Sequence, residues 1–182
     1  MVLRLAGPVR SILGAVLTLS LVGCGGSSSG QTEEGDALDI GEGSTGVELQ
    51  DPAPVGTVMN LKIVGLSPRP SRAVRLVDLR PVVVNGCKVE ARGGRLYDID
   101  VSETGIVAFA GDLGASDIAN FAPLPLDSVA LDAGNAERYF AMAEVVALEP
   151  GRCEITGVDV IYEEGGESYV QRSPSGFIFQ AS

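Results

Sequence analysis

The sequence predicts an all-β fold, an antiparallel β-sandwich over residues 53–182 of a 182-residue chain. Two observations predict it. Short apolar runs recur roughly every ten residues, and turns that contain Gly or Pro separate them, which is the spacing typical of sandwich folds. One run also alternates strictly between apolar and polar residues, and a period of two indicates a strand with one buried face. Its residues are Tyr97, Asp98, Ile99, Asp100, Val101 and Ser102.

The first 23 residues have the pattern of an export signal. Arg4 and Arg10 precede an uncharged, mostly aliphatic run over residues 11–22. This order of a basic segment followed by an apolar one is typical of secretory signal peptides. The run is shorter than the ~20 residues that a membrane-spanning helix needs. A retained transmembrane anchor is therefore the less favoured alternative.

The signal ends at Leu21-Val22-Gly23-Cys24, which resembles the lipobox of bacterial lipoproteins. An aliphatic residue three positions before the cysteine and a small residue directly before it carry the resemblance, which covers residues 1–24 only. It implies that the chain is cut before Cys24 and that acyl chains such as palmitate anchor this residue in a membrane of the cell envelope. Gly25, in place of aspartate, implies the outer membrane rather than the inner one.

Charge and composition exclude several classes of function. Removal of residues 1–23 leaves 11 basic residues against 24 acidic ones, a net charge of −13. This balance argues against binding nucleic acid or anionic lipid headgroups, because both need a basic surface. The chain has no histidine, which excludes Ser-His-Asp and Cys-His nucleophile systems and imidazole-dependent metal sites. No catalytic residue and no cofactor is predicted.

Residues 24–52 are predicted to be the lipidated cysteine and a flexible, acidic tether rich in Gly and Ser. Residues 25–30 contain only Gly and Ser, and residues 31–52 bring seven acids and no base. Such a composition cannot offset the entropy lost on ordering. The acids are interpreted as a solvated spacer and not as metal ligands; four of them are Glu33, Glu34, Asp36 and Asp39.

The folded part is predicted to begin at about Ala53. Pro81 lies inside one apolar run and predicts an edge position or a break, because proline cannot donate to a β-ladder. Asn85-Gly86, Gly93-Gly94 and the two glycines of residues 164–167 predict tight turns. The predicted strands cover 58–66, 73–84, 87–91, 96–102, 105–110, 153–162, 168–172 and 177–180.

Residues 136–148 are ambiguous between helix and strand. Alanine, glutamate and leucine favour a helix, and Asn135 could cap it. Tyr139-Phe140 and Val145-Val146 favour a strand that forms a hairpin with the segment that follows, across a type II turn at residues 149–152. We predict the strand.

Two cysteines remain once Cys24 is assigned to the lipid by resemblance. Export delivers Cys87 and Cys153 to an oxidising compartment, so an even number of them predicts one disulfide. The two residues lie 66 positions apart, and a bridge that closes such a loop stabilises the fold by about 4 kcal/mol in the chain-entropy model. Two separately buried thiols are the alternative.

Two acidic clusters are weak candidates for sites. Asp98, Asp100 and Ser102 offer oxygen ligands at alternate positions, as calcium loops do, but Glu103 stands where the loop needs a glycine. A strand with its acids facing outward is the favoured interpretation. Acidic residues also flank the glycines of residues 164–167, where they are expected to be solvated at a hairpin tip: Glu163, Glu164 and Glu167.

In its rhythm of strands and turns, the predicted domain is similar to bacterial immunoglobulin-like β-sandwiches. The sequence therefore predicts a lipid-anchored envelope protein with a non-catalytic binding or structural module, whose partner is an envelope protein or a polysaccharide. Two alternatives stay open. One is a carboxylate-dependent hydrolase with its site in the long connection over residues 111–127. The other is a calcium-stabilised adhesion or assembly module.

Overall fold

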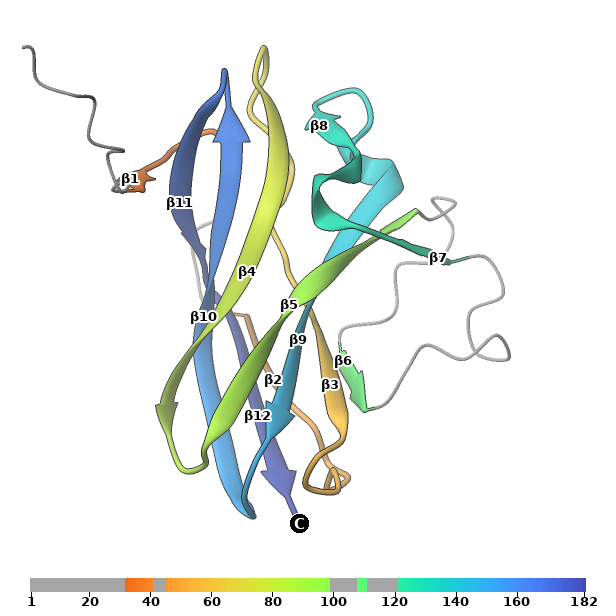
Figure 1. The fold of residues 1–182 in the computed structure, drawn as a ribbon, viewed down its shortest axis with the longest axis vertical. Coiled ribbons are helices and arrows are strands. Elements are labelled where there is room, and N and C mark those ends of the chain that lie inside the picture. The colour runs from red at the N-terminus through yellow and green to blue at the C-terminus, as the bar shows by residue number, and fades with distance from the viewer. Residues whose placement is uncertain (1–31, 41–44, 99–107, 111–120) are drawn as a thin grey trace, which may run out of the picture. The chain divides into compact units, whose positions relative to one another are not determined.

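The computed structural model describes residues 32–40, 45–98, 108–110 and 121–182, which form an all-β unit of two curled sheets (Figure 1). No helix among these residues is long and apolar enough to cross a membrane. The elements are β1 (Glu33–Glu34), β2 (Thr45–Glu48), β3 (Val58–Lys62), β4 (Ala73–Asn85), β5 (Val89–Asp98), β6 (Ala108–Ala110), β7 (Ala122–Leu124), β8 (Ala130–Asp132), β9 (Tyr139–Ala147), β10 (Gly151–Glu164), β11 (Glu167–Ser173) and β12 (Ser175–Ala181), with the short 3₁₀ helices η1 (Leu126–Ser128) and η2 (Ala136–Arg138).

The first sheet is built around β10, its longest strand. β4 pairs antiparallel with one edge of β10, while β11 and then β12 pair antiparallel with the other edge. β8 extends the sheet beyond the start of β4, and β1 and β2 add as parallel strands to β11 and β12. The residues before β3 therefore form the far edge of this sheet.

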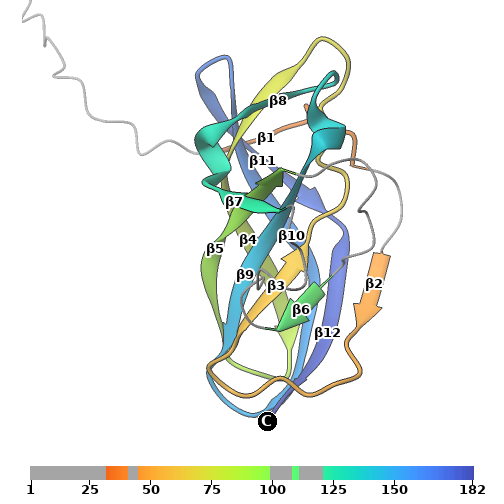
Figure 2. The ribbon, with the colours of Figure 1, turned by 90° about the vertical axis from the view of Figure 1, so that its right-hand side faces the viewer.

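The second sheet has the order β6-β3-β9-β5-β7, with every pair antiparallel (Figure 2). Strand β9 lies at its centre. The choice of strand for residues 136–148 is confirmed for β9, and η2 precedes it. The predicted hairpin with the following segment is wrong, because β9 pairs with β3 and β5 while β10 belongs to the first sheet.

The two sheets pack against each other through their inner faces. Each of two clusters of buried side chains contains residues from both sheets. In one, Leu79 and Val160 of the first sheet meet Leu96 of the second. In the other, Ile155 and Phe179 meet Met59 and Val145. The prediction of an all-β fold is therefore confirmed.

Pro81 lies on a one-sided stretch of β4, where the strand has a described neighbouring strand on one side only. Among the described residues, β4 has a second neighbour only at residues 73–75, where it pairs with β8, so Pro81 pairs with β10 alone. The register also shifts beside it, between the pairs Ile155–Val83 and Val158–Pro81. Both predicted alternatives, an edge and a break, are thus present. Nearby, the backbone N–H of Leu79 donates to the carboxylate of Asp78 at 2.9 Å.

The predicted turn at Gly93-Gly94 is wrong, because β5 runs through it from Val89 to Asp98. Gly93 has a φ of +83° and lies in a bulge opposite β9. A Cβ at Gly94 would lie 2.6 Å from the carbonyl oxygen of Met142. The two glycines therefore allow a bulge and a close approach within a continuous strand.

The prediction of a flexible tether over residues 24–52 does not hold for residues 32–40 and 45–52, because the compact unit spans Gln31–Ser182. Ala37 and Leu38 are fully buried in the core. The acids Glu33, Glu34 and Asp39 are exposed. An acidic average composition concealed a few apolar residues that reach the core, and these residues are enough to order the segment.

We expect Leu38→Ala to lower the free energy of unfolding by about 2–5 kcal/mol, the usual cost of a buried Leu-to-Ala change. A flexible tether would make the same change neutral. Leu148→Ala is the control, because Leu148 is 42% exposed and its truncation should cost less than about 0.5 kcal/mol. Denaturant unfolding followed by circular dichroism measures both; equal effects would contradict the packing of residues 32–40.

Candidate functional site

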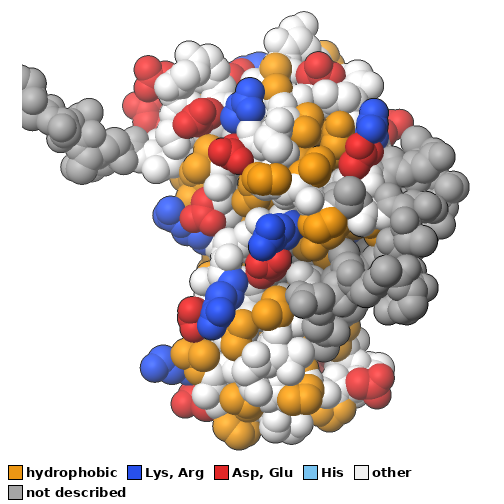
Figure 3. Space-filling model, turned by 45° about the vertical axis from the view of Figure 1, so that its right-hand side comes forward, with side chains coloured by type: hydrophobic (Ala, Val, Ile, Leu, Met, Phe, Trp, Pro, Cys, Tyr) orange, Lys and Arg blue, Asp and Glu red, His pale blue; other side chains and the backbone are white. Residues whose placement is uncertain are grey.

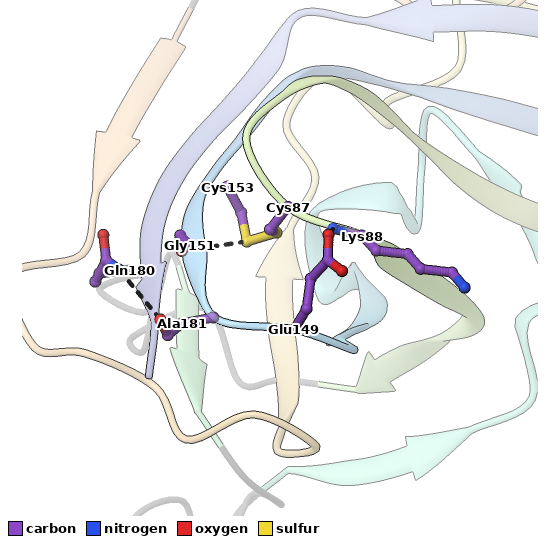
Figure 4. Close-up of a disulfide and its surroundings, with 7 residues drawn as sticks. All are labelled: Cys87, Lys88, Glu149, Gly151, Cys153, Gln180 and Ala181. Atoms are coloured by element: carbon purple, nitrogen blue, oxygen red, sulfur yellow. Dashed lines mark hydrogen bonds between the residues drawn. A yellow bond between two sulfur atoms is a disulfide. The ribbon is translucent and has the colours of Figure 1, made fainter.

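Two short connections cross between the sheets at the same end of the unit, which we call the disulfide end (Figure 1). Residues 86–88 lead from β4 to β5, and residues 148–150 lead from β9 to β10. A disulfide joins Cys87 of the first connection to Cys153, two residues into β10, with their Cα atoms 5.0 Å apart (Figure 4). The bridge therefore ties the first connection to the start of β10, directly after the second connection, and its pairing is the one that the sequence predicts.

Hydrogen bonds from backbone N–H groups link the two crossings as well. The N–H of Leu148 donates to the carbonyl of Lys88 at 2.8 Å, and the N–H of Lys88 donates to the carboxylate of Glu149 at 3.2 Å. Cys153 is fully buried and Cys87 partly buried, in the same cluster as residues of both sheets. The disulfide thus lies at the margin of the core, with its surroundings already ordered by hydrogen bonds.

Gly86 allows the crossings to approach this closely. Its φ is +97°, and a Cβ at this position would lie 1.6 Å from the carbonyl oxygen of Arg152. The Asn85-Gly86 pair was expected to make a tight turn, and the chain does turn there. It then enters the other sheet, because the glycine is needed against β10 and does not close a hairpin with β5.

Exposed apolar side chains gather at the disulfide end. Six large apolar side chains are exposed among the described residues, and four of them lie here. Figure 3 shows orange side chains at the lower end of the molecule, where Figure 1 places the C-terminus. We call these four residues the apolar rim: Val55 (37% exposed), Val83 (37%), Val84 (50%) and Leu148 (42%).

A shallow hollow of about 220 Å³ lies on the first sheet beside this end. Arg152 and Glu48 lie on its border, with 3.7 Å between a guanidinium nitrogen and a carboxylate oxygen. Leu49, Ile178 and Phe179 line the hollow. With one carboxylate, already beside an arginine, this hollow is suited to contact and not to acid–base chemistry.

A second hollow, of about 360 Å³, lies between β4, β5 and η1. Two carboxylates line it, those of Asp78 and Asp127. The carboxylate of Asp78 forms an ion pair with Arg80 at 2.8 Å and accepts a hydrogen bond from the backbone N–H of Leu79. Asp127 is exposed. Residues 121–127 are the described part of the predicted 111–127 connection, and residues 111–120 lie outside the described residues.

Asp98, the described member of the predicted calcium group, binds an arginine. Nε and Nη2 of Arg138 both donate to its carboxylate, and these hydrogen bonds hold the pKa of Asp98 below its usual value. Asp100 and Ser102 lie outside the described residues. Within the described ranges, no group of three His, Cys, Asp or Glu side chains is arranged to hold a metal ion.

The hairpin acids do not converge on one point. Gly165 and Gly166 have φ values of +62° and +92° and form the predicted two-residue turn between β10 and β11. Glu164 accepts two hydrogen bonds from Arg72, at 2.7 Å each. Glu163 and Glu167 are exposed. The three carboxylates therefore divide between an ion pair and solvent.

An aromatic cluster on the outer face of the second sheet was missed by the sequence analysis. Tyr97 stacks on Phe140 with 5.0 Å between ring centroids, and Phe121 meets Phe140 edge to face at 5.2 Å. The ammonium of Lys62 lies 5.0 Å from the Phe140 ring, and burial lowers the pKa of Lys62. Alternation along β9 could have indicated this second apolar face, since Phe140 and Met142 are both buried opposite the inward-facing Ala141.

We expect Gly86→Ala to destabilise the fold by more than about 3 kcal/mol, because it adds a strained positive φ to a direct overlap with Arg152. Gly46→Ala is the matched control. Nothing lies within 4 Å of a Cβ at Gly46, and alanine is tolerated in a strand better than glycine, so its effect should stay within about 1 kcal/mol. Guanidinium unfolding with the disulfide intact compares them. Similar costs at both positions would contradict the close crossing.

The residues predicted for export and lipidation, Leu21, Val22, Gly23 and Cys24, lie outside the described residues. Comparison with protein-family models and with curated protein sequences finds no match to the chain. Its function is therefore argued from the sequence and from the geometry of the described residues.

Proposed function

We propose that the chain is an exported lipoprotein, anchored through Cys24 in a membrane of the bacterial envelope, and that its two-sheet unit is a non-catalytic binding or structural module. The lipobox-like motif at residues 21–24 supports the anchor. The disulfide supports export, because such bonds persist in oxidising compartments. Gly25 after the cysteine favours the outer membrane.

The apolar rim is the observation that carries the binding role. Isolated exposed apolar residues are ordinary, but a concentration of them at one end of a unit is typical of a contact surface. Elsewhere on the described surface, seven arginines already lie within 4.0 Å of acidic side chains. The rim offers a contact of another kind, because a partner that covers it buries apolar side chains.

The described residues also offer little to a reactive centre. Every buried side-chain nitrogen or oxygen among them has a hydrogen-bond partner. Neither hollow gathers buried carboxylates. These features favour contact over catalysis. The same proposal includes a likeness to bacterial immunoglobulin-like sandwiches, which the two packed, mainly antiparallel sheets support.

We expect Cys24→Ser to release unlipidated protein or to leave the uncut precursor, because each buried CH₂ of an acyl chain contributes ~0.8 kcal/mol to membrane attachment and the variant has no acyl chain. Intact-mass analysis and membrane fractionation measure the result. Ser27→Ala is the control, since it changes a residue close to Cys24 and leaves the motif and the disulfide unchanged. Mature Cys24→Ser protein that remains in the membrane fraction would refute the anchor.

We expect Leu148→Asp or Val84→Asp to abolish recovery of a partner that copurifies with the native protein after cross-linking in its own envelope. A charge at the centre of an apolar contact must be desolvated without a counter-charge. Val77→Asp is the matched control, because Val77 is 43% exposed and lies away from the disulfide end. If Val77→Asp has the same effect as the rim variants, the rim is not the contact surface.

A further inference from the structure

Residues 33–40, which we call the strap, attach the N-terminal part of the chain to the end of the unit opposite the disulfide. Glu33 pairs with Tyr169, three residues after the turn between β10 and β11. We call the end of the unit at this turn the hairpin end. From there, residues 33–40 and 45–53 follow the edge formed by β11 and β12, until Ala53 bridges to Ala181 at the disulfide end. The chain therefore joins the unit at the hairpin end.

The strap is held by contacts of several kinds. Leu38 is fully buried, and the amide of Gln171 binds both of its backbone groups, accepting from the N–H at 3.1 Å and donating to the carbonyl at 2.9 Å. The N–H of Ala37 donates to the buried hydroxyl of Tyr162 at 3.0 Å. Gly35 passes over Tyr162 so closely that a Cβ there would lie 2.0 Å from its oxygen.

Ion pairs with Arg72 connect the strap to the end of β10. Arg72 donates to Glu164 at the end of β10 and to Asp36 of the strap, at 2.7 Å and 3.2 Å. On the other side, the strap pairs with residues 67–69, through the N–H of Asp39 to Ser67 and the N–H of Arg69 to Ala37. The strap therefore belongs to the fold.

We propose that the strap determines which end of the unit faces the membrane. The inference rests on the proposed lipid anchor at Cys24. Nine residue steps separate Cys24 from Glu33, which span about 30 Å at full extension. Tyr169, the partner of Glu33, lies opposite Tyr162, eleven residue steps along β10 from Gly151 at the disulfide end, and these steps span about 36 Å. A unit standing on its disulfide end would lift Glu33 by more than the chain can reach.

The strap therefore keeps the hairpin end proximal to the membrane and presents the disulfide end, with the apolar rim, to the aqueous space. A free chain over residues 24–52 would extend about 100 Å and would permit either orientation. The anchor and the short chain hold the hairpin end near the membrane, while exposed acids at this end repel anionic headgroups at short range and oppose its adsorption. These acids are Glu33, Glu34, Glu163 and Glu167.

Energy transfer to the membrane surface tests the orientation. Glu167→Cys and Leu148→Cys each place one dye, at the hairpin and disulfide ends, on the full lipidated protein. The vesicles contain phosphatidylethanolamine and phosphatidylglycerol with a trace of acceptor-labelled lipid. Transfer should be severalfold stronger from position 167. Equal transfer from both positions, or stronger transfer from position 148, would overturn the proposal.

A linker insertion tests the part played by the strap. A flexible Gly/Ser segment of about twenty residues, placed between Gln31 and Thr32, lengthens the connection between Cys24 and the strap and leaves the strap unchanged. The difference in transfer between the two dyes should then shrink. The same segment appended after Ser182 is the control and should change nothing. An undiminished difference after the insertion would show that the strap does not set the orientation.

Two further measurements distinguish a failure of the proposed anchor from a failure of the strap. Intact mass of the same preparation reports the lipid, and its absence would overturn the anchor and the orientation together. Hydrogen exchange on the Cys24→Ser chain reports the strap without any lipid. The amides of Gly35, Ala37, Leu38 and Asp39 should exchange slowly, and rapid exchange at all four would overturn the strap even if the anchor holds.

Discussion

The close crossing of two chain segments at the disulfide end holds the two sheets together. β4 and β10 pair within the first sheet, yet the chain leaves β4 for the second sheet and returns from β9 to begin β10. Gly86 has no side chain, and this allows the connection after β4 to lie directly against Arg152 at the start of β10. The Cys87–Cys153 bridge closes a separation of 66 residues there and restricts the unfolded chain, which contributes about 4 kcal/mol in the chain-entropy model.

Local signals in the sequence predicted much of the strand content and the hairpin turn, because period-two alternation and paired glycines act over a few residues. Pairing partners were harder to predict, as β9 shows. Its strand character follows from Tyr139-Phe140 and Val145-Val146, but its partners lie 41 to 88 residues away, and nothing local distinguishes a return in the same sheet from a crossing to the other. The turn predicted at Gly93-Gly94 was wrong for a related reason, since glycine is common both in tight turns and in β-bulges.

The N-terminal segment illustrates how composition can mislead. Averaged over residues 31–52, the acids indicate disorder, but order in this segment depends on single residues. Leu38 reaches the core, and Gln171, more than 130 positions away, supplies hydrogen bonds that a neighbouring strand would otherwise provide. For the candidate site, the sequence predicted the disulfide. The apolar rim could not be predicted, because its residues belong to separate segments that reach the same end of the unit only in the folded chain.

The one-sided stretch of β4 bears on how these molecules behave when crowded. An open strand edge is a template on which a second molecule can add its own strand and begin aggregation. Along this stretch the donor of Leu79 is already satisfied by Asp78, Pro81 has no donor to offer, and register shifts bend the ladder on both sides. Edge-to-edge growth would lack consecutive hydrogen bonds, so this edge is protected where many copies share a confined space.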